Sequence, residues 1–353
     1  MGDGESVFDH TQLRDFVADL FAGLGVPPSE AREFAGLLVE ADLRGVSSHG
    51  VVRIPWYVQD LRAGRTQPVL HLSVQRDSGP LVWLDGHDSL GHLVASRAMT
   101  TACERARGFG IGATAVRRGS HFGPAALYAE MAVQHQQVGI VLTNGGAVMA
   151  PWGGREKLLG NTPLAVGLPA GTEPPVILDS AQTVVAHGKL SYAKARGAAT
   201  VPEGWALDHD GRPTQNIDAA LEGLLVPIGG YKGYGMALVF DAICGLLLQA
   251  GVGEEIRTDQ HAGPGPGHLF LCLDVAFFGS VQDFQERMDA RIRQIRGSAK
   301  APGVEHIYLP GELEYDARRQ RLRNGIPLPV ALVRELDTQA RSVGIRTLSS
   351  QKG

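Results

Sequence analysis

The chain has few cysteines, no excess of positive charge and no long uninterrupted apolar run. Its three cysteines, Cys103, Cys244 and Cys272, are far apart in apolar surroundings, so we expect buried thiols of a reduced compartment rather than zinc ligands. With 33 basic against 37 acidic residues and a net charge of −4, the composition is not that of a general polyanion binder. We therefore expect no nucleic-acid partner.

Membrane and metal signals are also missing. The longest apolar stretch, residues 235–251, is interrupted by Asp241 and Gly245 and is shorter than a comfortable membrane span. The first six residues lack the basic and apolar regions of a signal peptide. The 12 histidines show no His-Glu-x-x-His spacing, so we expect no metal site. These absences predict a cytoplasmic protein that does not associate with membranes.

The 353 residues begin and end with helical patterns around an α/β middle. Apolar residues recur at helical spacing up to Gly23, a second helix is expected after Pro28 with Ser29 as its N-cap, and a third over about 50–63 with Pro55 in its first turn. Short β-rich runs predict strands over 81–84, 111–116, 138–142, 164–168, 176–178 and 269–275. Further helices are expected over 90–107, 123–135, 235–248, 281–296 and 329–343, and the glycine–proline alternation of 263–267 predicts a flexible surface turn.

Ser48-His49-Gly50 followed by Arg53 is the first candidate for chemistry. On a helix, His49 and Arg53 would be i,i+4 neighbours, and a guanidinium there can bind a carboxylate through two hydrogen bonds. A small 2-oxo or 2-hydroxy acid would suit this pair. In the alternative interpretation, His49 caps a turn and Arg53 makes a surface ion pair.

A nucleotide cofactor would suggest a Rossmann fingerprint, but Gly108, Gly110 and Gly112 have the wrong spacing. Other glycine-rich loops cover 143–146, 151–154, 160–163 and 229–235, and the last places Lys232 at the start of an apolar helix, an arrangement that favours phosphate. Asp179 ends a buried-looking strand, where it could bind a hydroxyl or orient a histidine. His121 lies between a predicted strand and helix, so it is either catalytic or bonded to backbone.

Nine motifs in order resemble one family, the type-2 malate/L-lactate dehydrogenases, over roughly residues 10–345. This sulfolactate-dehydrogenase-like family includes ureidoglycolate dehydrogenase, 2,3-diketo-L-gulonate reductase and Δ1-piperideine-2-carboxylate reductase. The motifs are Ala41-Asp42-Leu43-Arg44-Gly45, Ser48-His49-Gly50, Ser120-His121-Phe122-Gly123, Pro151-Trp152-Gly153-Gly154, Asp179-Ser180-Ala181, Gly188-Lys189, Pro202-x-Gly204-Trp205, Gly230 to Gly235, and Leu309-Pro310-Gly311-Glu312.

The resemblance implies an NAD(P)-dependent oxidoreductase with a mixed sheet, a non-Rossmann cofactor-binding fold and an additional helical lobe formed from both chain ends. It also implies a homodimer with its active site in a cleft close to the subunit interface. We expect three parts: an N-terminal helical part over 1–70, an α/β cofactor- and substrate-binding core over 71–280, and a C-terminal helical part over 281–353 that packs with the N-terminal helices.

The resemblance also assigns roles to residues. His49 matches the proton donor of the reductases, His121 the proton acceptor of ureidoglycolate-type members, and Arg53 the substrate-carboxylate position, so the choice between the histidines stays open. Ser48 could hydrogen-bond substrate, and Asp179 could fix the imidazole tautomer or contact the cofactor. The matching cofactor-contacting residues are Gly145, Val176, Ile177, Leu178, Asp179, Ser180, Ala181, Gln182, Tyr231, Lys232, Gly311 and Glu312.

The sequence also departs from the family pattern. Gly160-Asn161-Thr162-Pro163 reverses the usual Gly-Thr-Asn-Pro, Arg118-Gly119-Ser120 replaces Asn-Ser-Asn, and Gln182 stands where Ser or Thr is frequent. None of these changes removes His49 or Arg53.

The expected reaction is hydride transfer between a nicotinamide (NAD or NADP) and C2 of a small 2-hydroxy or 2-oxo carboxylic acid, with His49 as imidazolium protonating the substrate oxygen during reduction. The alternative is a reductase of cyclic or N-alkyl 2-imino acids. A noncatalytic binding protein is disfavoured, because His49, Arg53, His121 and Lys232 occur together. The sequence does not choose between NAD and NADP.

Overall fold

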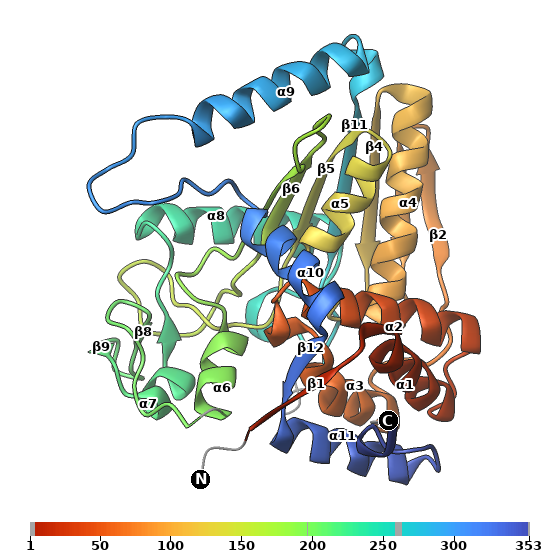
Figure 1. Cartoon of the computed structure of the whole chain (residues 1–353), viewed down its shortest axis with the longest axis vertical. Coiled ribbons are helices and arrows are strands. Elements are labelled where there is room, and N and C mark those ends of the chain that lie inside the picture. The colour runs from red at the N-terminus through yellow and green to blue at the C-terminus, as the bar shows by residue number, and fades with distance from the viewer. Residues whose placement is uncertain (1–3, 196, 258–262, 352–353) are drawn as a thin grey trace.

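A seven-stranded mixed sheet forms the centre of the computed structural model, which describes residues 4–195, 197–257 and 263–351 (Figure 1). The strand order is β2-β3-β4-β11-β5-β6-β7, and neighbours are antiparallel except for the parallel pair β3–β4. The strands are β2 Ser73–Ser78, β3 Leu81–Asp85, β4 Ile111–Arg117, β5 Gln137–Thr143, β6 Leu164–Leu168, β7 Val176–Ser180 and β11 His268–Asp274. The predicted α/β class is confirmed, although β2 was not expected.

The burial predicted for one strand, β7, was wrong. β7 was expected to be buried, but it is the last strand of the sheet and Leu178 is 39% exposed. A short apolar run cannot distinguish an edge strand from a central one, because both alternate in the same way.

Each expected helix is present over much of its range, and three further helices, over 187–195, 217–222 and 312–324, were not expected. The helices are α1 His10–Gly23, α2 Pro28–Leu43, α3 Ile54–Arg62, α4 Gly91–Phe109, α5 Ala126–Gln134, α6 His187–Ala195, α7 Ile217–Glu222, α8 Tyr231–Asp241, α9 Val281–Arg296, α10 Glu312–Asn324 and α11 Val330–Ser342. The expected N-cap Ser29 lies inside α2, because Pro28 already occupies the first helical position. The predicted helix over 235–248 begins earlier, at Tyr231, and continues after Asp241 as a π-helical segment over Ala242–Leu247.

Helices α4 and α5 cover one face of the sheet, as Figure 1 shows. Their contact with the strands depends on glycines, since a Cβ added at Gly112 of β4 would overlap the carbonyl oxygen of Ala102. A Cβ at Gly139 of β5 would lie 2.7 Å from the carbonyl oxygen of Ala129. Glycine at these points lets the helix backbone lie directly on the strands.

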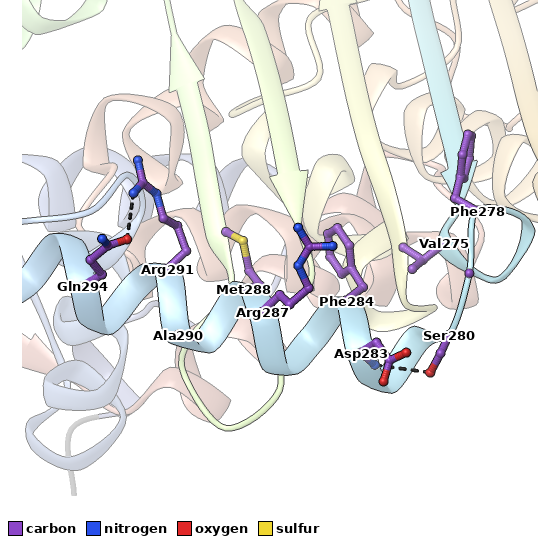
Figure 2. Close-up of a pocket in the computed structure, with 11 residues that line it drawn as sticks. Val275, Phe278, Ser280, Asp283, Phe284, Arg287, Met288, Ala290, Arg291 and Gln294 are labelled. Carbon is purple, nitrogen blue, oxygen red and sulfur yellow. Dashed lines mark hydrogen bonds between the residues drawn. The ribbon is translucent and has the colours of Figure 1, made fainter.

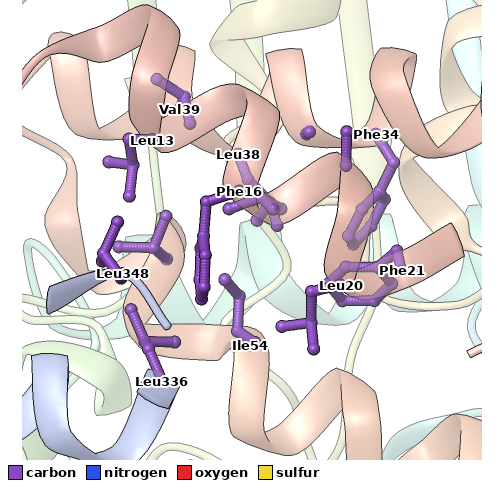
Figure 3. Packing of buried hydrophobic residues seen from close by; sticks show 14 of the residues in the cluster. Leu13, Phe16, Leu20, Phe21, Phe34, Leu38, Val39, Ile54, Leu336 and Leu348 are labelled. Atoms are coloured by element: carbon purple, nitrogen blue, oxygen red, sulfur yellow. The ribbon is translucent and has the colours of Figure 1, made fainter. Parts of the chain in front are cut away.

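A second apolar core joins residues from both ends of the chain. Figure 3 shows Phe16 and Leu20 of α1 packed with Ile54 of α3, and Leu336 of α11 with Leu348 close by. The strands β1 Glu5–Phe8 and β12 Ile326–Pro329 pair antiparallel beside this core. Asp9 caps α1 by accepting hydrogen bonds from the amides of residues 11 and 12, at 2.8 and 3.1 Å.

A smaller apolar cluster is formed by α6, α7 and two short strands, β8 Ala206–Leu207 and β10 Leu224–Leu225. The strand β9 Pro213–Thr214 pairs with β8 beside it. Residues 263–267, expected to form a flexible surface turn, instead include two buried glycines, Gly265 and Gly267. Pro266 accepts a hydrogen bond from the amide of Gly119 at 3.0 Å, so this segment supports the loop before His121. No helix of the described residues is long and apolar enough to cross a membrane.

Candidate active site

Ser48, His49 and Arg53 lie on two consecutive 3-10 turns, Ser47–His49 and Val51–Arg53. Gly50 between the turns has φ −91° and ψ −146°, so no continuous helix joins His49 to Arg53 and the i,i+4 arrangement considered for a helical segment is not present. The physical reason is the carboxylate of Asp42, which fills the space where a Cβ at residue 50 would lie. The same carboxylate accepts the amide of Val51, which a continuous helix would bond to the carbonyl oxygen of Ser47, so the helix does not run through Gly50.

The buried carboxylate of Asp42 packs against Gly50 and stabilises the two turns. Asp42 is 1% exposed, and its Oδ2 accepts a hydrogen bond from the amide of Val51 at 2.7 Å. Burial raises the pKa of Asp42 to about 7, while the Val51 amide, Arg321 and Ser47 act in the opposite direction. Arg321 of α10 also donates a hydrogen bond to the carbonyl oxygen of Asp42, so this contact joins the turns to the C-terminal part of the chain.

The Arg53 side chain folds back over the turn that carries the histidine. Its Nε donates to the carbonyl oxygen of Ser48 at 2.8 Å, and its guanidinium lies 5.7 Å from the ring centroid of Trp56. The guanidinium rests against Gly188 at the start of α6, where an added Cβ would overlap it. Because Nε is already bonded, the two terminal nitrogens are the ones available for a carboxylate.

His121 lies opposite His49, so the structure brings the two candidate histidines together. Their ring centroids are 5.5 Å apart and the ring planes differ by 18°, which is a stacked arrangement. The Tyr57 hydroxyl lies 2.6 Å from Nδ1 of His121, and Ser48 Oγ lies 2.9 Å from Nδ1 of His49. Each histidine therefore has a hydroxyl partner at Nδ1.

Burial keeps both histidines neutral at neutral pH in the substrate-free protein. It lowers the pKa of His49 to about 4, and the Arg53 charge lowers it further. The pKa of His121 is well below its usual value, mainly through burial, with His49 and Arg53 contributing. The imidazolium expected for His49 is thus disfavoured, and a substrate carboxylate that neutralises Arg53 would raise the pKa of His49 by removing only the smaller of the two causes.

Several residues of the site were missed from the sequence. Tyr57 and Trp56 lie on α3, and His92 of α4 is fully buried with its ring 5.5 Å from the Tyr57 ring. Tyr57 gave no usable signal, because its partner His121 lies 64 residues away in the chain. His92 gave no signal, because its position depends on packing between α4 and α3.

The loop that carries His121 is connected to the predicted cofactor-binding loop of Gly145 through hydrogen bonds at the ends of β5 and β11. His268, the first residue of β11, lies with Nδ1 2.7 Å from Thr143 Oγ1 at the end of β5 and with Nε2 3.2 Å from the carbonyl oxygen of Ser120. Gly145 follows two residues after Thr143. The central strand therefore fixes the distance between His121 and Gly145.

The predicted cofactor loops around Gly145 and Gln182 lie together. The Gln182 amide donates to the carbonyl oxygen of Asn161 at 2.8 Å, and its carbonyl accepts from Ile228 at 3.0 Å, just before Tyr231 and Lys232. Gly160 packs so closely on Gly145 that an added Cβ would overlap the Gly145 carbonyl. The glycine-rich loops over 143–146, 160–163 and 229–235 therefore lie next to one another and form one surface.

This surface has features that suit a phosphate-bearing group. Among the described residues, Thr162 Oγ1 is buried without a hydrogen-bond partner and has a hydrogen to donate. Gln182 Oε1 is also buried without a partner, but it only accepts, so it suits a hydroxyl or amide of a cofactor and not its phosphate. Helix α8 begins after Gly230 without a side-chain cap, and Lys232 is exposed in its first turn. Free amides and an ammonium group at a helix start favour an anion, so these residues fit a dinucleotide cofactor.

Residues 176–182 and 311–312 also meet. The amide of Ile177 donates to the carbonyl oxygen of Pro310 at 3.0 Å, and Gly311 lies against Ile177. Glu312 accepts from the amide of Leu309 at 3.0 Å and lies 2.9 Å from Nε2 of His306. The Glu312 carboxylate therefore stabilises the loop over 306–311 that precedes α10.

Asp179 does not orient a histidine. Its Oδ2 accepts a hydrogen bond from the amide of Ala126, the first residue of α5, at 2.8 Å. Desolvation by the surrounding protein raises the pKa of Asp179 to about 6, the Ala126 amide opposes this shift, and Glu314 adds to it. The histidine-orienting role considered for Asp179 is not found, whereas a cofactor contact stays a prediction.

A sequence model of the malate/L-lactate dehydrogenases matches residues 8–337. The chain belongs to this family. Among its relatives is a malate dehydrogenase of Pyrococcus abyssi, 34% identical over 345 residues, which cover 96% of this chain and 95% of the relative. The sulfolactate dehydrogenase from Methanocaldococcus jannaschii has a solved structure with a TM-score of 0.90 at 32% identity, covering 98% of this chain and 99% of that chain.

Other members of the family differ in cofactor and substrate. A (2R)-3-sulfolactate dehydrogenase (NADP(+)) of Chromohalobacter salexigens is 32% identical, covering 90% of this chain and 93% of the relative. A ureidoglycolate dehydrogenase (NAD(+)) of Escherichia coli K12 is 29% identical, covering 90% of both. The solved Δ1-piperideine-2-carboxylate reductase from Pseudomonas syringae pvar. tomato has a TM-score of 0.85 at 27% identity, covering 95% of this chain and 100% of that chain.

Proposed function

We propose that this malate/L-lactate dehydrogenase family member is an NAD(P)-dependent oxidoreductase that interconverts small 2-hydroxy and 2-oxo carboxylic acids. One observation carries the proposal: the Arg53 side chain lies beside the stacked rings of His49 and His121. A guanidinium with two free nitrogens binds a carboxylate, and the adjacent imidazoles lie where the oxygen on C2 would be. The uncapped start of α8 with Lys232 offers an anion site for the dinucleotide.

In this proposal the nicotinamide, when bound, supplies or accepts the hydride at C2. Arg53 holds the carboxylate and so orients C2, while Ser48 hydrogen-bonds the substrate or the His49 ring. Both histidines contact the C2 oxygen through Nε2, because Nδ1 of each ring is already hydrogen-bonded to a hydroxyl group. The dinucleotide would be held by Gly145, residues 176–182, Tyr231-Lys232 and Gly311-Glu312.

We also propose that the dinucleotide binds without a Rossmann fold. The strands flanking β11 are antiparallel to it, whereas a Rossmann sheet is built from parallel strands with a glycine fingerprint after the first. The chain ends share one apolar core, which supports a helical lobe formed from both ends. The three-part division at residues 70 and 280 and a cytoplasmic location remain predictions.

A homodimer is part of the proposal. Helix α9 has only Asp289 and Ile292 buried along its 16 residues, and Phe278 before it is 77% exposed. A hollow of about 920 Å³ runs along this helix, and Figure 2 shows Phe284 and Met288 projecting from the same side. A second copy of the chain would cover this apolar surface. Sedimentation of the wild type and of Phe278→Asp tests it, because a monomer in both would contradict the dimer.

A second candidate function is the reduction of cyclic or N-alkyl 2-imino acids. The neutral state of His49 and His121 favours it, because an iminium carbon is already electrophilic and needs no proton donor. The family includes a piperideine-2-carboxylate reductase. Turnover of 2-oxo acids with and without added amine separates the two reactions, since an imine reductase would require the amine or a preformed cyclic imine.

The test of the main proposal is a panel of 2-oxo acids, 2-hydroxy acids and cyclic imino acids, each assayed with NADH, NADPH and their oxidised forms. Turnover of an oxo or hydroxy acid with either cofactor is the expected result. Binding of NADH and NADPH is followed separately by fluorescence titration. A protein that binds neither cofactor would overturn the proposal and favour a noncatalytic binding role.

A further inference from the structure

We infer that Tyr57 is a positioning residue that fixes the tautomer of His121, so that His121 only donates a hydrogen bond to the substrate oxygen while His49 exchanges the proton. The inference rests on the proposed function and deepens it, because it divides the two histidines between two tasks. It follows from the direction of one hydrogen bond and from the difference between a tyrosine and a serine partner.

The hydrogen bond between Tyr57 and His121 has a preferred direction. The Tyr57 hydroxyl is buried, and among the described residues its hydrogen-bond partner is Nδ1 of His121 at 2.6 Å. If His121 donated instead, the phenolic hydrogen would be left without an acceptor inside the protein. An unpaired buried donor disfavours that arrangement by roughly tenfold or more. Tyr57 therefore donates, and Nδ1 of His121 accepts.

The tautomer of His121 follows from that direction. A neutral imidazole carries one hydrogen, so a ring that accepts at Nδ1 carries its hydrogen on Nε2. The His49 ring stacks on one side at 5.5 Å and Trp56 meets the ring edge-on at 5.2 Å, which restrains its rotation. Nε2–H is then the group that His121 offers to a ligand. The low pKa of His121 and the raised pKa of Tyr57 keep both groups in these neutral forms.

His49 is not restrained in the same way. Its Nδ1 lies 2.9 Å from Ser48 Oγ, and an aliphatic hydroxyl can donate or accept by rotating its hydrogen. His49 can therefore hold its proton on either nitrogen, and its Nε2 can act as an acceptor or a donor. This freedom is what a group that takes and returns a proton requires.

The division of tasks balances in both directions. In oxidation, C2 would lose its hydride to NAD⁺ or NADP⁺, the hydroxyl proton would pass to Nε2 of His49, and that proton would later be released to water. In reduction, His49 returns a proton to the oxygen as the C2–H bond forms. In both directions the His121 Nε2–H bond stabilises negative charge on that oxygen without being transferred.

The decisive experiment is NMR of the full-length protein with ¹⁵N-labelled histidine at neutral pH. The His121 resonances are assigned by their loss in His121→Asn, and long-range couplings report which nitrogen carries hydrogen. We expect the Nε2–H tautomer in the wild type and a mixture in Tyr57→Phe, which keeps the ring and removes only the hydroxyl. An Nδ1–H tautomer in the wild type, or an unchanged tautomer in Tyr57→Phe, would overturn the inference.

Tyr128→Phe is the matched control, because Tyr128 is also buried and its hydroxyl donates to the carbonyl oxygen of Phe122, next to His121, at 2.5 Å. We expect this variant to leave the His121 tautomer and turnover unchanged. In Tyr57→Phe we expect kcat to fall roughly tenfold with an unchanged dissociation constant for NADH or NADPH. The NMR measurement needs no substrate, so failure of the inference and failure of the proposed function are distinguishable.

Discussion

Arg53→Gln tests the carboxylate clamp most directly. In the structure Nε is bonded to Ser48, so two terminal nitrogens remain for the substrate. Each charge-assisted hydrogen bond is worth about 1.5–3 kcal/mol, and loss of both predicts at least about 3 kcal/mol, or roughly a 100-fold fall in kcat/KM. Arg53→Lys keeps the charge but not the two-point geometry, so we expect an intermediate loss of roughly tenfold.

The assay is steady-state turnover of the best substrate of the panel, with cofactor affinity measured separately by fluorescence. Most of the loss should appear in KM, and cofactor affinity should not change. Arg97→Gln is the control, because Arg97 of α4 pairs with Glu33 of α2 and lies outside the site. Unchanged KM together with unchanged kcat/KM in Arg53→Gln would refute the reasoning.

The same substitution has a second effect, on pH dependence. Burial is the larger cause of the low pKa of His49, and the Arg53 charge is the second. Removing that charge raises the pKa of His49 towards its usual value. In the oxidative direction, where neutral His49 accepts a proton, the acid limb of kcat/KM should therefore move to higher pH. An acid limb that stays in place or moves down would contradict the assignment.

Three further predictions concern proton transfer, cofactor binding and stability. His49→Gln should lower kcat by about 100-fold or more while NADH or NADPH binding is retained, and near-normal turnover would contradict its role. Lys232→Met should weaken cofactor binding roughly tenfold, with a smaller difference at high salt, and an unchanged dissociation constant would exclude Lys232 from the phosphate site. The pKa of Asp42 is raised to about 7 in the folded state, so its contribution favours folding below the unfolded pKa near 4 and is lost as pH rises to 7. In urea unfolding, Asp42→Asn should therefore gain about 3 kcal/mol of stability relative to the wild type between pH 4.5 and pH 7.5, and a constant difference would contradict the shifted pKa.

The regular elements were predictable because their apolar residues repeat with the period of a helix or a strand. The ranges of β6 and α9 agree with the expected ones residue for residue. The edge position of β7 was not predictable, since strand order depends on contacts between distant segments. The Gly50 conformation was missed for a related reason, because it depends on a carboxylate eight residues earlier in the chain.

The candidate site was predictable as a set of residues and not as a geometry. His49, Arg53 and His121 were identified, and the structure brings them together. Their hydrogen-bond partners were only partly foreseen: Ser48 was adjacent in sequence, whereas Tyr57 lies 64 residues from His121. The histidine-orienting role of Asp179 failed because β7 places its carboxylate at the start of α5.

The position of β11 has a consequence for how the chain folds during synthesis. β4 and β5 do not pair with each other, because β11 lies between them and hydrogen-bonds to both. Until residues 268–274 emerge, β2-β3-β4 and β5-β6-β7 can form only as two separate ribbons, each with an unpaired edge. When β11 inserts, it pairs with the free edges of β4 and β5. Its first residue, His268, then contacts both Thr143 and Ser120 and so fixes the relative position of their loops. Recovery of activity on refolding would thus report the insertion of this strand, and intermediates that lack it would be the ones most prone to aggregate.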